Sequence, residues 1–350
     1  MIVAGMSGGV DSAVSALLLR ELGLDVVGVF MKNWDEEEDG VCAATRDYDD
    51  VRRTCDTIGI PYYTVNFAKE YYDRVFAHCL REFEAGRTPN PDVLCNREIK
   101  FDAFLKFAEG IGAEKIATGH FVRTDDGGRL LKGTDANKDQ SYFLYMLKSE
   151  QLRRAVFPVG GMTKREVREI ARRANLPVSE KKDSTGICFI GERRFKPFLQ
   201  KYFNAEKGDI VTPDGTIIGR HDGLMYYTIG QRRGLGVGGK GGGEGRRFVV
   251  AKDTRNNRLI VEQNERSELL YSSEVKLTDI TWIAREPPAH SFRCAAKFRY
   301  RQPDQVVTVT LTETGATVRA CEPQRAVTPG QSAVLYDGEV CLGGGIVSDS

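Results

Sequence analysis

The chain has 350 residues, of which 41% are hydrophobic and 28% are charged, and its formal net charge is +1. This length suits roughly two or three domains of about 150 residues each, and no run of residues is apolar for long enough to form a membrane span. Because the first residues lead directly into a predicted strand and turn, we expect no signal peptide and therefore a cytoplasmic protein.

Charge is distributed unevenly along the chain. Residues 33–50 carry 8 acidic side chains and 1 basic one, whereas residues 151–200 carry 12 basic and 5 acidic side chains. A basic segment can bind a polyanion such as nucleic acid, or it can form the solvated face of a helix. Composition alone leaves both interpretations open.

A glycine-rich turn follows the first predicted strand. The turn and the start of the next helix comprise Gly5, Met6, Ser7, Gly8, Gly9, Val10, Asp11 and Ser12. Paired glycines permit positive φ angles and close approach of a ligand, while a helix start presents unpaired N–H groups, so the turn suits a phosphate. It is neither a Walker A loop nor a dinucleotide fingerprint. It resembles the pyrophosphate-binding loop of the ATP pyrophosphatase superfamily; the alternative is an ordinary turn that binds nothing.

Short β-rich runs alternate with helical periods over the first two hundred residues. We predict strands at 25–31, 62–67 and 115–118, a surface hairpin from 121–123 and 129–132, and helices at 49–58, 69–83, 96–111, 140–147 and 164–174. This alternation predicts an α/β domain with a doubly wound parallel sheet. The glycine turn, Met31 and Gly119 all fall at carboxyl ends of strands and should share one crevice.

Glycine and β-branched residues become more frequent after about residue 202. Short strands are predicted at 209–211, 215–218, 247–251 and 258–262, and strongly alternating ones at 306–311, 317–320 and 332–336. They predict two small β-rich domains, of which the last is an antiparallel β-barrel. We therefore divide the chain at residues 1–203, 204–270 and 271–350, and expect the glycine-rich stretch at 234–245 to be a mobile loop.

The 8 cysteines include no C-x-x-C pair, which argues against a zinc ribbon. Cys95 precedes a predicted helix that Asn96 or Asp92 would cap, so the helix dipole would favour its thiolate, with Asp92 close enough to act as acid or base. Cys188 lies in a polar loop near Lys181 and Lys182, which would lower the pKa of its thiol. Burial as small core residues is the alternative for both cysteines.

Several other segments combine donors, charge and aromatic faces. Lys138, Asp139 and Gln140 form one such segment, and Arg299 and Tyr300 form another. Groups of this kind can hold phosphates and stack an extruded base, although solvated loops also contain them. A lone histidine such as His120 is more often structural than catalytic.

The motifs taken together resemble the bacterial tRNA-specific 2-thiouridylase family over essentially the whole chain. They are the loop at 5–12, Phe-Met-Lys-Asn-Trp at 30–34, Thr-Pro-Asn-Pro-Asp-Val-Leu-Cys-Asn at 88–96, Ala-Thr-Gly-His at 117–120, Lys-Asp-Gln-Ser-Tyr-Phe at 138–143, Asp-Ser-Thr-Gly-Ile-Cys-Phe-Ile-Gly at 183–191, Gly-Gln-Arg-Arg-Gly at 230–234 and Gln-Arg-Ala-Val-Thr-Pro-Gly-Gln at 324–331.

The resemblance implies thiolation at C2 of the wobble uridine in tRNAs for Lys, Glu and Gln. ATP would adenylate the C2 oxygen, and a persulfide sulfur would then displace AMP. Cys188 would be the persulfide carrier, Cys95 the nucleophile that frees sulfur or forms a Cys95–Cys188 disulfide, and Asp92 the acid/base. A protein that donates persulfide sulfur is an implied partner.

The resemblance also implies the binding residues. ATP would bind at the loop, Met31 and Gly119, with Mg²⁺ on its phosphates, and the target base would contact Asn90, Pro91 and Asp92. The implied contacts to the rest of the tRNA are His120, Lys138, Asp139, Gln140, Arg299, Tyr300 and Gln331. The later β domains would hold the tRNA stem while the base is flipped into the crevice.

Three alternatives remain open at the level of sequence. The chain could be another adenylating enzyme of the same superfamily, such as an amide-forming ligase, or a tRNA-binding protein without catalysis. Asp92, Cys95 and Cys188 could also ligate an iron–sulfur cluster, because thiolates are its usual ligands. The sequence assigns no role to the other cysteines, which are Cys42, Cys55, Cys79, Cys294, Cys321 and Cys341.

Overall fold

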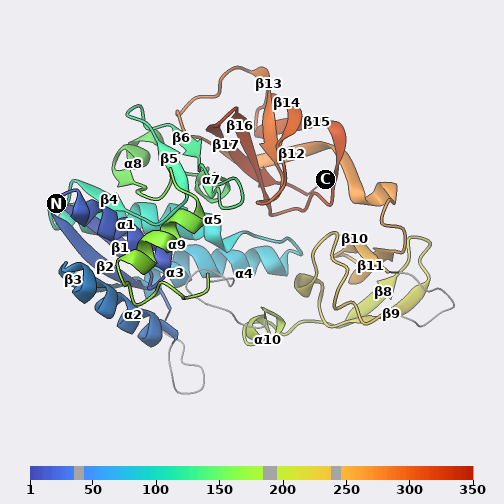
Figure 1. Cartoon of the computed structure of the whole chain (residues 1–350). Helices are drawn as coiled ribbons and strands as arrows, with labels where there is room; N and C mark the ends of the chain where they lie inside the picture. Colours follow the sequence, from blue (N-terminus) through green and yellow to red (C-terminus); the bar gives the residue numbers. More distant parts are fainter. Residues whose placement is uncertain (35–42, 184–194, 238–245, 350) are drawn as a thin grey trace.

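The computed structural model describes residues 1–34, 43–183, 195–237 and 246–349, which form three parts in chain order. Figure 1 shows an α/β part at the N-terminal end, a small β-sheet and a β-barrel that carries the C-terminus. Within the described residues, no helix combines the length and the apolar character needed to cross a membrane. The α/β part followed by β-rich parts confirms the predicted fold class.

A parallel five-stranded sheet forms the centre of the first part. Its strand order is β3-β2-β1-β4-β7. The strands are β1 (Ile2–Met6), β2 (Val26–Lys32), β3 (Tyr62–Asn66), β4 (Lys115–Ala117) and β7 (Ala155–Val156). Strands β1 and β2 are almost entirely buried, as the apolar runs in their sequences require when helices cover both faces of a sheet.

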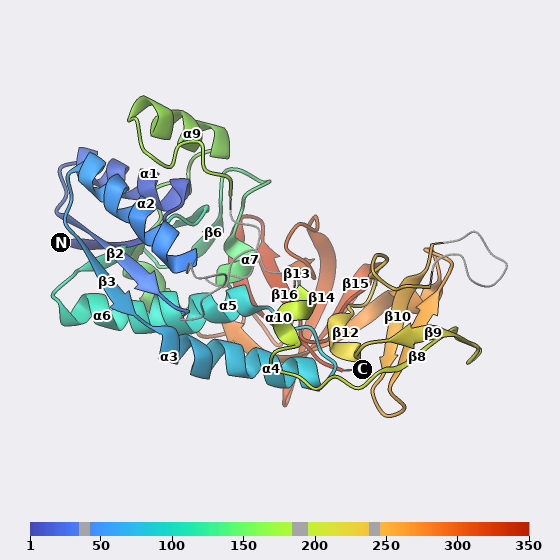
Figure 2. The ribbon, with the colours of Figure 1, turned by 90° about the horizontal axis from the view of Figure 1, so that it is seen from below.

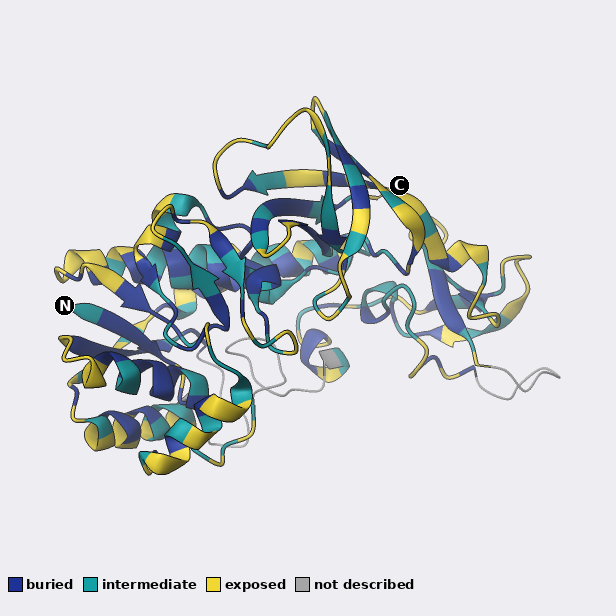
Figure 3. Cartoon of the chain, turned by 45° about the horizontal axis from the view of Figure 1, so that its top comes forward, coloured by how far each residue is buried: buried dark blue, intermediate teal, exposed yellow. Residues whose placement is uncertain are grey.

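Helices cover both faces of this sheet. On one side lie α1 (Val10–Glu21), α2 (Ala43–Ile58) and α9 (Lys164–Arg173), and on the other side lie the helices of residues 68–110 (Figure 2). In Figure 3, buried residues follow the strands between these layers, whereas exposed residues follow the outer faces of the helices. This arrangement leaves the carboxyl ends of the strands as an edge where loops meet.

The two long helices on the second face each contain a π-helical stretch. The first consists of α3 (Ala68–Tyr71), η1 (Tyr72–Phe76) and α4 (Ala77–Glu84), and the second of α5 (Pro91–Cys95), η2 (Asn96–Ala103) and α6 (Phe104–Gly110). The prediction for the second helix was wrong about its start. Pro91 occupies its first turn, where a missing N–H costs nothing, so the helix begins five residues before the predicted start.

The hairpin after β4 is not the simple surface feature that we predicted. Its strands are β5 (Val122–Thr124) and β6 (Leu130–Lys132), and β6 pairs antiparallel with the last strand of the chain. Leu130 is completely buried there, opposite Cys341. The short helices α7 (Ser141–Leu144) and α8 (Ser149–Arg153) follow, so only part of the helix predicted at 140–147 forms.

The middle part is a four-stranded sheet of order β10-β11-β8-β9. It follows α10 (Phe195–Leu199) and contains β8 (Gly208–Val211), β9 (Ile217–His221), the 3-10 turn η3 (Leu224–Tyr226), β10 (Phe248–Asp253) and β11 (Arg258–Glu262). All four predicted strands are present. Most of the predicted mobile loop, from residue 238 to 245, lies outside the described residues.

The last part is a closed barrel, as predicted. After the turn η4 (Glu268–Leu270) come β12 (Tyr271–Trp282), β13 (Ser291–Lys297), β14 (Gln305–Thr312), β15 (Gly315–Arg325), β16 (Ser332–Asp337) and β17 (Val340–Val347). Pairing of β12 with β17 closes the order β12-β15-β14-β13-β16-β17, and β6 and β5 extend the sheet from β17. Alternating apolar residues such as Val307 and Val309 fill its interior.

Candidate active site

The glycine turn connects β1 to α1 and is held by its own serines. Gly8 has a φ of +72°, and a Cβ there would lie 2.7 Å from the carbonyl oxygen of Asp47. The Ser12 hydroxyl accepts a hydrogen bond from Ser7 N at 3.2 Å and donates one to Gly9 O at 3.0 Å. The positive φ and the close approach explain why glycine is needed at residue 8.

Met31 and Gly119 both lie against this turn. A Cβ on Gly5 would be 3.2 Å from Met31 Cε, and a Cβ on Gly119 would be 2.6 Å from Ser12 N. The turn, the end of β2 and the residue two positions after β4 therefore converge, as their places at the carboxyl ends of strands predicted. Their contact with ATP stays a prediction.

A cluster of charged side chains stands beside the turn. Lys164 Nζ lies 2.6 Å from Asp11 Oδ1 and 2.8 Å from Asp183 Oδ1, and Asp183 also contacts Lys138 Nζ at 2.5 Å and Arg168 Nη2 at 2.9 Å. Burial raises the pKa of Asp11, and Lys164 only partly offsets this. Burial would also raise the pKa of Asp183, but hydrogen bonds from Lys138 and Lys164 lower it to about 2.

Lys181 fixes the turn from another side. Its Nζ donates to Gly8 O at 2.9 Å and lies 2.8 Å from Asp47 Oδ1 and 2.7 Å from Asp50 Oδ2, which links α2 to the turn. The sequence suggested this lysine as a neighbour of Cys188, which lies outside the described residues. The roles of Lys164, Arg168 and Lys181 at the turn were missed, and their only signal was the basic excess of residues 151–200.

Asn90 caps the helix that carries Asp92 and Cys95. Its Oδ1 accepts hydrogen bonds from Asp92 N at 3.2 Å and Val93 N at 3.4 Å, so our expectation of a cap at Asn96 or Asp92 was wrong. Cys95 is the fifth residue of this helix, so it lies in the second turn and not before the helix as predicted. Its side chain is completely buried. The predicted Cys95–Cys188 pair and its disulfide stay predictions, because Cys188 is outside the described residues.

Two buried amide oxygens near these segments lack hydrogen bonds. Asn96 Nδ2 donates to Phe143 O at 3.0 Å, but Asn96 Oδ1 has no partner among the described residues, and the same is true of Asn33 Oδ1. Asn96 follows Cys95, and Asn33 follows Met31 by two residues. Buried polar atoms without partners are uncommon and are found where a ligand or water completes the site.

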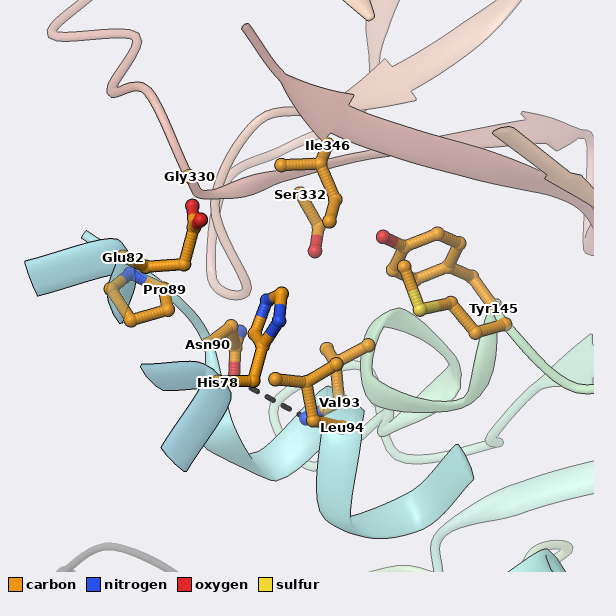
Figure 4. Close-up of a pocket in the computed structure, with 11 residues that line it drawn as sticks. His78, Glu82, Pro89, Asn90, Val93, Leu94, Tyr145, Gly330, Ser332 and Ile346 are labelled. Carbon is orange, nitrogen blue, oxygen red and sulfur yellow. Dashed lines mark hydrogen bonds between the residues drawn. The ribbon is translucent and has the colours of Figure 1, made fainter. Parts of the chain in front are cut away.

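A narrow pocket lies between the Asn90 segment and the barrel. Figure 4 shows His78 and Tyr145 facing its interior, with Ser332 of β16 on the opposite wall. Its lining comprises His78, Glu82, Pro89, Asn90, Val93, Leu94, Tyr145, Met146, Gly330, Ser332 and Ile346. The predicted base-contacting segment therefore borders the seam between the α/β part and the barrel.

Gln331 holds this seam together. Its Nε2 donates to Thr88 O at 2.8 Å and to Pro89 O at 3.4 Å, while Thr88 N donates to Pro329 O at 2.9 Å. These contacts fix the backbone that leads into Asn90. The predicted contact of Gln331 with tRNA stays a prediction beside this observed one.

His120, Asp139 and Gln140 make internal contacts. His120 is buried, its Nδ1 lies 2.8 Å from Thr118 Oγ1, and burial lowers its pKa well below the usual value. Asp139 accepts hydrogen bonds from Gly133 N at 3.0 Å and from Ser141 N at 3.1 Å, and Gln140 Oε1 accepts one from Phe121 N at 2.9 Å. These contacts order the segment; binding of tRNA by it stays a prediction.

Arg299 and Tyr300 connect the barrel to other parts of the chain. Arg299 remains exposed in part while its Nη2 donates to Ile229 O at 3.0 Å and Ala326 O at 2.9 Å. The Tyr300 ring lies 4.4 Å from that of Phe143, centroid to centroid. Their predicted contact with tRNA is likewise untested.

The cysteines without a predicted role include four with suppressed ionisation. Burial raises the pKa of these thiols to about 12, which disfavours nucleophilic thiolate; they are Cys55, Cys79, Cys294 and Cys341. Cys321 is exposed, and Cys42 lies outside the described residues.

Three family models match the chain in order. The tRNA methyl transferase HUP domain matches residues 1–192, the tRNA methyl transferase PRC-barrel domain matches residues 196–263, and the aminomethyltransferase beta-barrel domain matches residues 272–347. The descriptions of these models refer to methyl transfer, whereas similar individual proteins are named for thiolation. Each family model matches one part of the chain, whereas a single curated relative matches nearly all of it.

Curated relatives are similar over nearly the whole chain. The tRNA-specific 2-thiouridylase MnmA 2 of Geobacillus kaustophilus (strain HTA426) is 57% identical over 353 residues, which is 99% of this chain and 94% of the relative. The tRNA-specific 2-thiouridylase MnmA of Alkaliphilus oremlandii (strain OhILAs) is 57% identical over 352 residues, which is 99% of this chain and 96% of the relative.

A solved structure, that of a 4-thiouridine synthetase–RNA complex with bound ATP, is 18% identical with a TM-score of 0.35, and the likeness covers 57% of this chain and 48% of that one. By its similarity to the curated relatives, the chain belongs to the family of enzymes named tRNA-specific 2-thiouridylases.

Proposed function

We propose that this enzyme thiolates C2 of the wobble uridine in tRNAs for Lys, Glu and Gln at the expense of ATP. The observation that carries the proposal is the convergence of the glycine turn with Met31 and Gly119, in a chain of this family. The C2 oxygen attacks the α-phosphate of ATP, pyrophosphate leaves, and the oxygen becomes part of an AMP leaving group. The turn binds the phosphates through the start of α1.

Mg²⁺ fits this site as a companion of ATP. No group of three or more His, Cys, Asp or Glu side chains in the described parts of the chain is arranged to hold a metal ion. Mg²⁺ commonly takes one or two carboxylates together with phosphate oxygens, and Asp11 supplies such a carboxylate in the turn. When bound, the ion would neutralise charge on the phosphates.

Sulfur transfer requires two thiols. The terminal sulfur of a Cys188 persulfide attacks C2, and AMP departs with the former C2 oxygen. The Cys95 thiolate then attacks Cys188 Sγ, which releases the thiolated base and leaves a Cys95–Cys188 disulfide. A thiol reductant regenerates the two thiols, and a protein persulfide donor reloads Cys188. Asp92, three residues before Cys95 on the same helix, moves the proton.

The remaining residues of the proposal recognise tRNA. Asn90, Pro91 and Asp92 contact the flipped base, supported by the pocket that this segment shares with the barrel. The rest of the tRNA lies across Lys138, Gln140, Arg299, Tyr300 and Gln331, with the buried His120 and Asp139 positioning their segments, and the reaction takes place in the cytoplasm.

The test is anaerobic turnover of cluster-free protein with ATP, Mg²⁺, unmodified tRNA, a protein persulfide donor and a thiol reductant, with thiolated uridine measured by mass spectrometry. Cys95→Ser and Cys188→Ser are compared with Cys321→Ser, a matched control at an exposed cysteine. We expect the parent and the control to thiolate and both other variants to fail. Thiolation only after iron–sulfur reconstitution contradicts the persulfide route, and absence of tRNA-dependent AMP release contradicts the function as a whole.

A further inference from the structure

The charged cluster beside the glycine turn holds one carboxylate among three cations. Asp183 lies 2.5 Å from Lys138 Nζ, 2.8 Å from Lys164 Nζ and 2.9 Å from Arg168 Nη2. The three cations come from separate places, with Lys164 and Arg168 one turn apart on α9 and Lys138 in the segment before α7. Three cationic side chains thus share the Asp183 carboxylate, and of these Lys164 also contacts a second carboxylate, that of Asp11.

Lys164 connects this cluster to the turn. Its Nζ also contacts Asp11 at 2.6 Å, while only 12% of its side chain is exposed. The next residue on the helix, Arg165, points to solvent, with 86% of its side chain exposed. It forms an ion pair with Glu169 on the same helix, at 3.6 Å. The helix therefore directs one cation to the turn and the adjacent one away from it, which a merely solvated basic helix would not require.

We propose that Lys138, Lys164 and Arg168 form the site that binds the β- and γ-phosphates of ATP, and hence the pyrophosphate product, with Asp183 as an internal anion that phosphate displaces. This inference rests on the proposed function, because it takes ATP as the source of the pyrophosphate. It gives Lys138 a role in binding phosphate in addition to the proposed contact with tRNA. Pyrophosphate carries more negative charge than a carboxylate and offers more acceptor oxygens, so it matches three cationic donors better.

A competing internal anion has a measurable consequence. Removing a cation weakens binding of pyrophosphate, whereas removing the Asp183 charge strengthens it, because the cations no longer have to release a carboxylate first. Loss of structure cannot imitate the second effect, since a damaged site binds its ligand less tightly. The opposite signs of the two changes therefore separate displacement from a purely structural ion-pair network.

The experiment titrates the full chain with inorganic pyrophosphate by calorimetry, for the parent and for Lys164→Met, Arg165→Met and Asp183→Asn. We expect binding to weaken about tenfold in Lys164→Met and to tighten about threefold in Asp183→Asn, as for the loss of one charged hydrogen bond or one competitor. Arg165→Met, on the same helix, should stay within about twofold of the parent.

Equal affinities for Lys164→Met and Arg165→Met would overturn the inference, as would weaker binding by Asp183→Asn. The parent is also assayed for ATP-dependent thiolation of tRNA. If the parent thiolates tRNA but Lys164→Met binds pyrophosphate as tightly as the parent does, the phosphate site is refuted and the proposed function stands. Pyrophosphate binding that follows the expected order in a protein without thiolation refutes the function and leaves the anion site standing.

Discussion

The crevice at the glycine turn and the seam beside the barrel use polar side chains in different ways. In the crevice, charged groups such as Lys164 and Asp183 contact one another, as the proposed displacement of Asp183 by phosphate requires. At the seam, Gln331 donates to the backbone carbonyls of Thr88 and Pro89, and Arg299 in the same way joins the barrel to the middle part through Ile229 O, so these side chains hold backbone segments in position. The first region is arranged for exchange of ligands and the second for holding backbone in position.

The largest expected effect is at Gly119. Its Cβ in Gly119→Ala would lie 2.6 Å from Ser12 N and displace the turn, so we expect kcat/KM for ATP to fall about a hundredfold. Gly110→Ala is the control, because a Cβ at Gly110 meets nothing within 4 Å. Steady-state kinetics measures both, and urea unfolding verifies that each variant is folded. Kinetics of Gly119→Ala like those of the parent would show that the crevice tolerates a shift of the turn.

A smaller effect is expected at the seam from Gln331→Ala. The variant loses the hydrogen bonds to Thr88 O and Pro89 O, so Asn90 is held less firmly and kcat/KM for tRNA should fall about tenfold. The KM for ATP should not change, because the crevice is built from other residues. Gln263→Ala, at an exposed residue of the middle part, serves as the control. A change in the KM for ATP would mean that the two regions are not separate.

Arg299→Lys should reduce stability more than activity. Arg299 Nη2 donates to both Ile229 O and Ala326 O, and the lysine side chain is one atom shorter and ends before that position, so we expect the free energy of unfolding to fall by about 1–2 kcal/mol. Denaturant unfolding measures the change. Arg301→Lys, at a neighbouring exposed residue, should change the free energy of unfolding by less than about 0.5 kcal/mol. Equal losses in the two variants would show that the Arg299 hydrogen bonds do not stabilise the contact between the barrel and the middle part.

The smallest effect concerns pH. Burial holds the pKa of His120 well below 6.5 in the folded chain, so below pH 6.5 the unfolded chain binds a proton that the folded chain does not. The stability due to neutral His120 is complete above that pH and is lost as pH falls, with a slope of at most about 1.4 kcal/mol per pH unit. Unfolding between pH 5 and pH 8 should show this slope for the parent and a shallower one for His120→Gln. An identical slope would assign the pH dependence to other groups.

The sequence predicts the parts of the molecule that depend on local pattern. Apolar runs between helical periods identify β1 and β2, and the positions of the turn, Met31 and Gly119 at the carboxyl ends of parallel strands predict that they meet. The cap at Asn90 could also have been read from Asn-Pro, since proline suits the first turn of a helix.

Contacts between distant segments could not be predicted in the same way. Nothing in residues 130–132 identifies residues 340–341 as their partners, and Gln331 gives no sign of reaching Thr88. Lys164 and Arg165 are adjacent basic residues with opposite surroundings, which only the rotation of α9 against the turn decides. Such choices depend on tertiary packing, which is not encoded in any one window of sequence.

The pairing of β6 with β17 has a consequence for the order in which the chain is made. A ribosome releases residues 122–132 long before residues 340–347, so β6 has an unpaired edge and Leu130 lacks its covering until synthesis is nearly complete. The first domain therefore matures only when the final strand arrives. A chain that ends before β17 leaves this edge exposed, so such fragments are expected to aggregate more readily than the full chain.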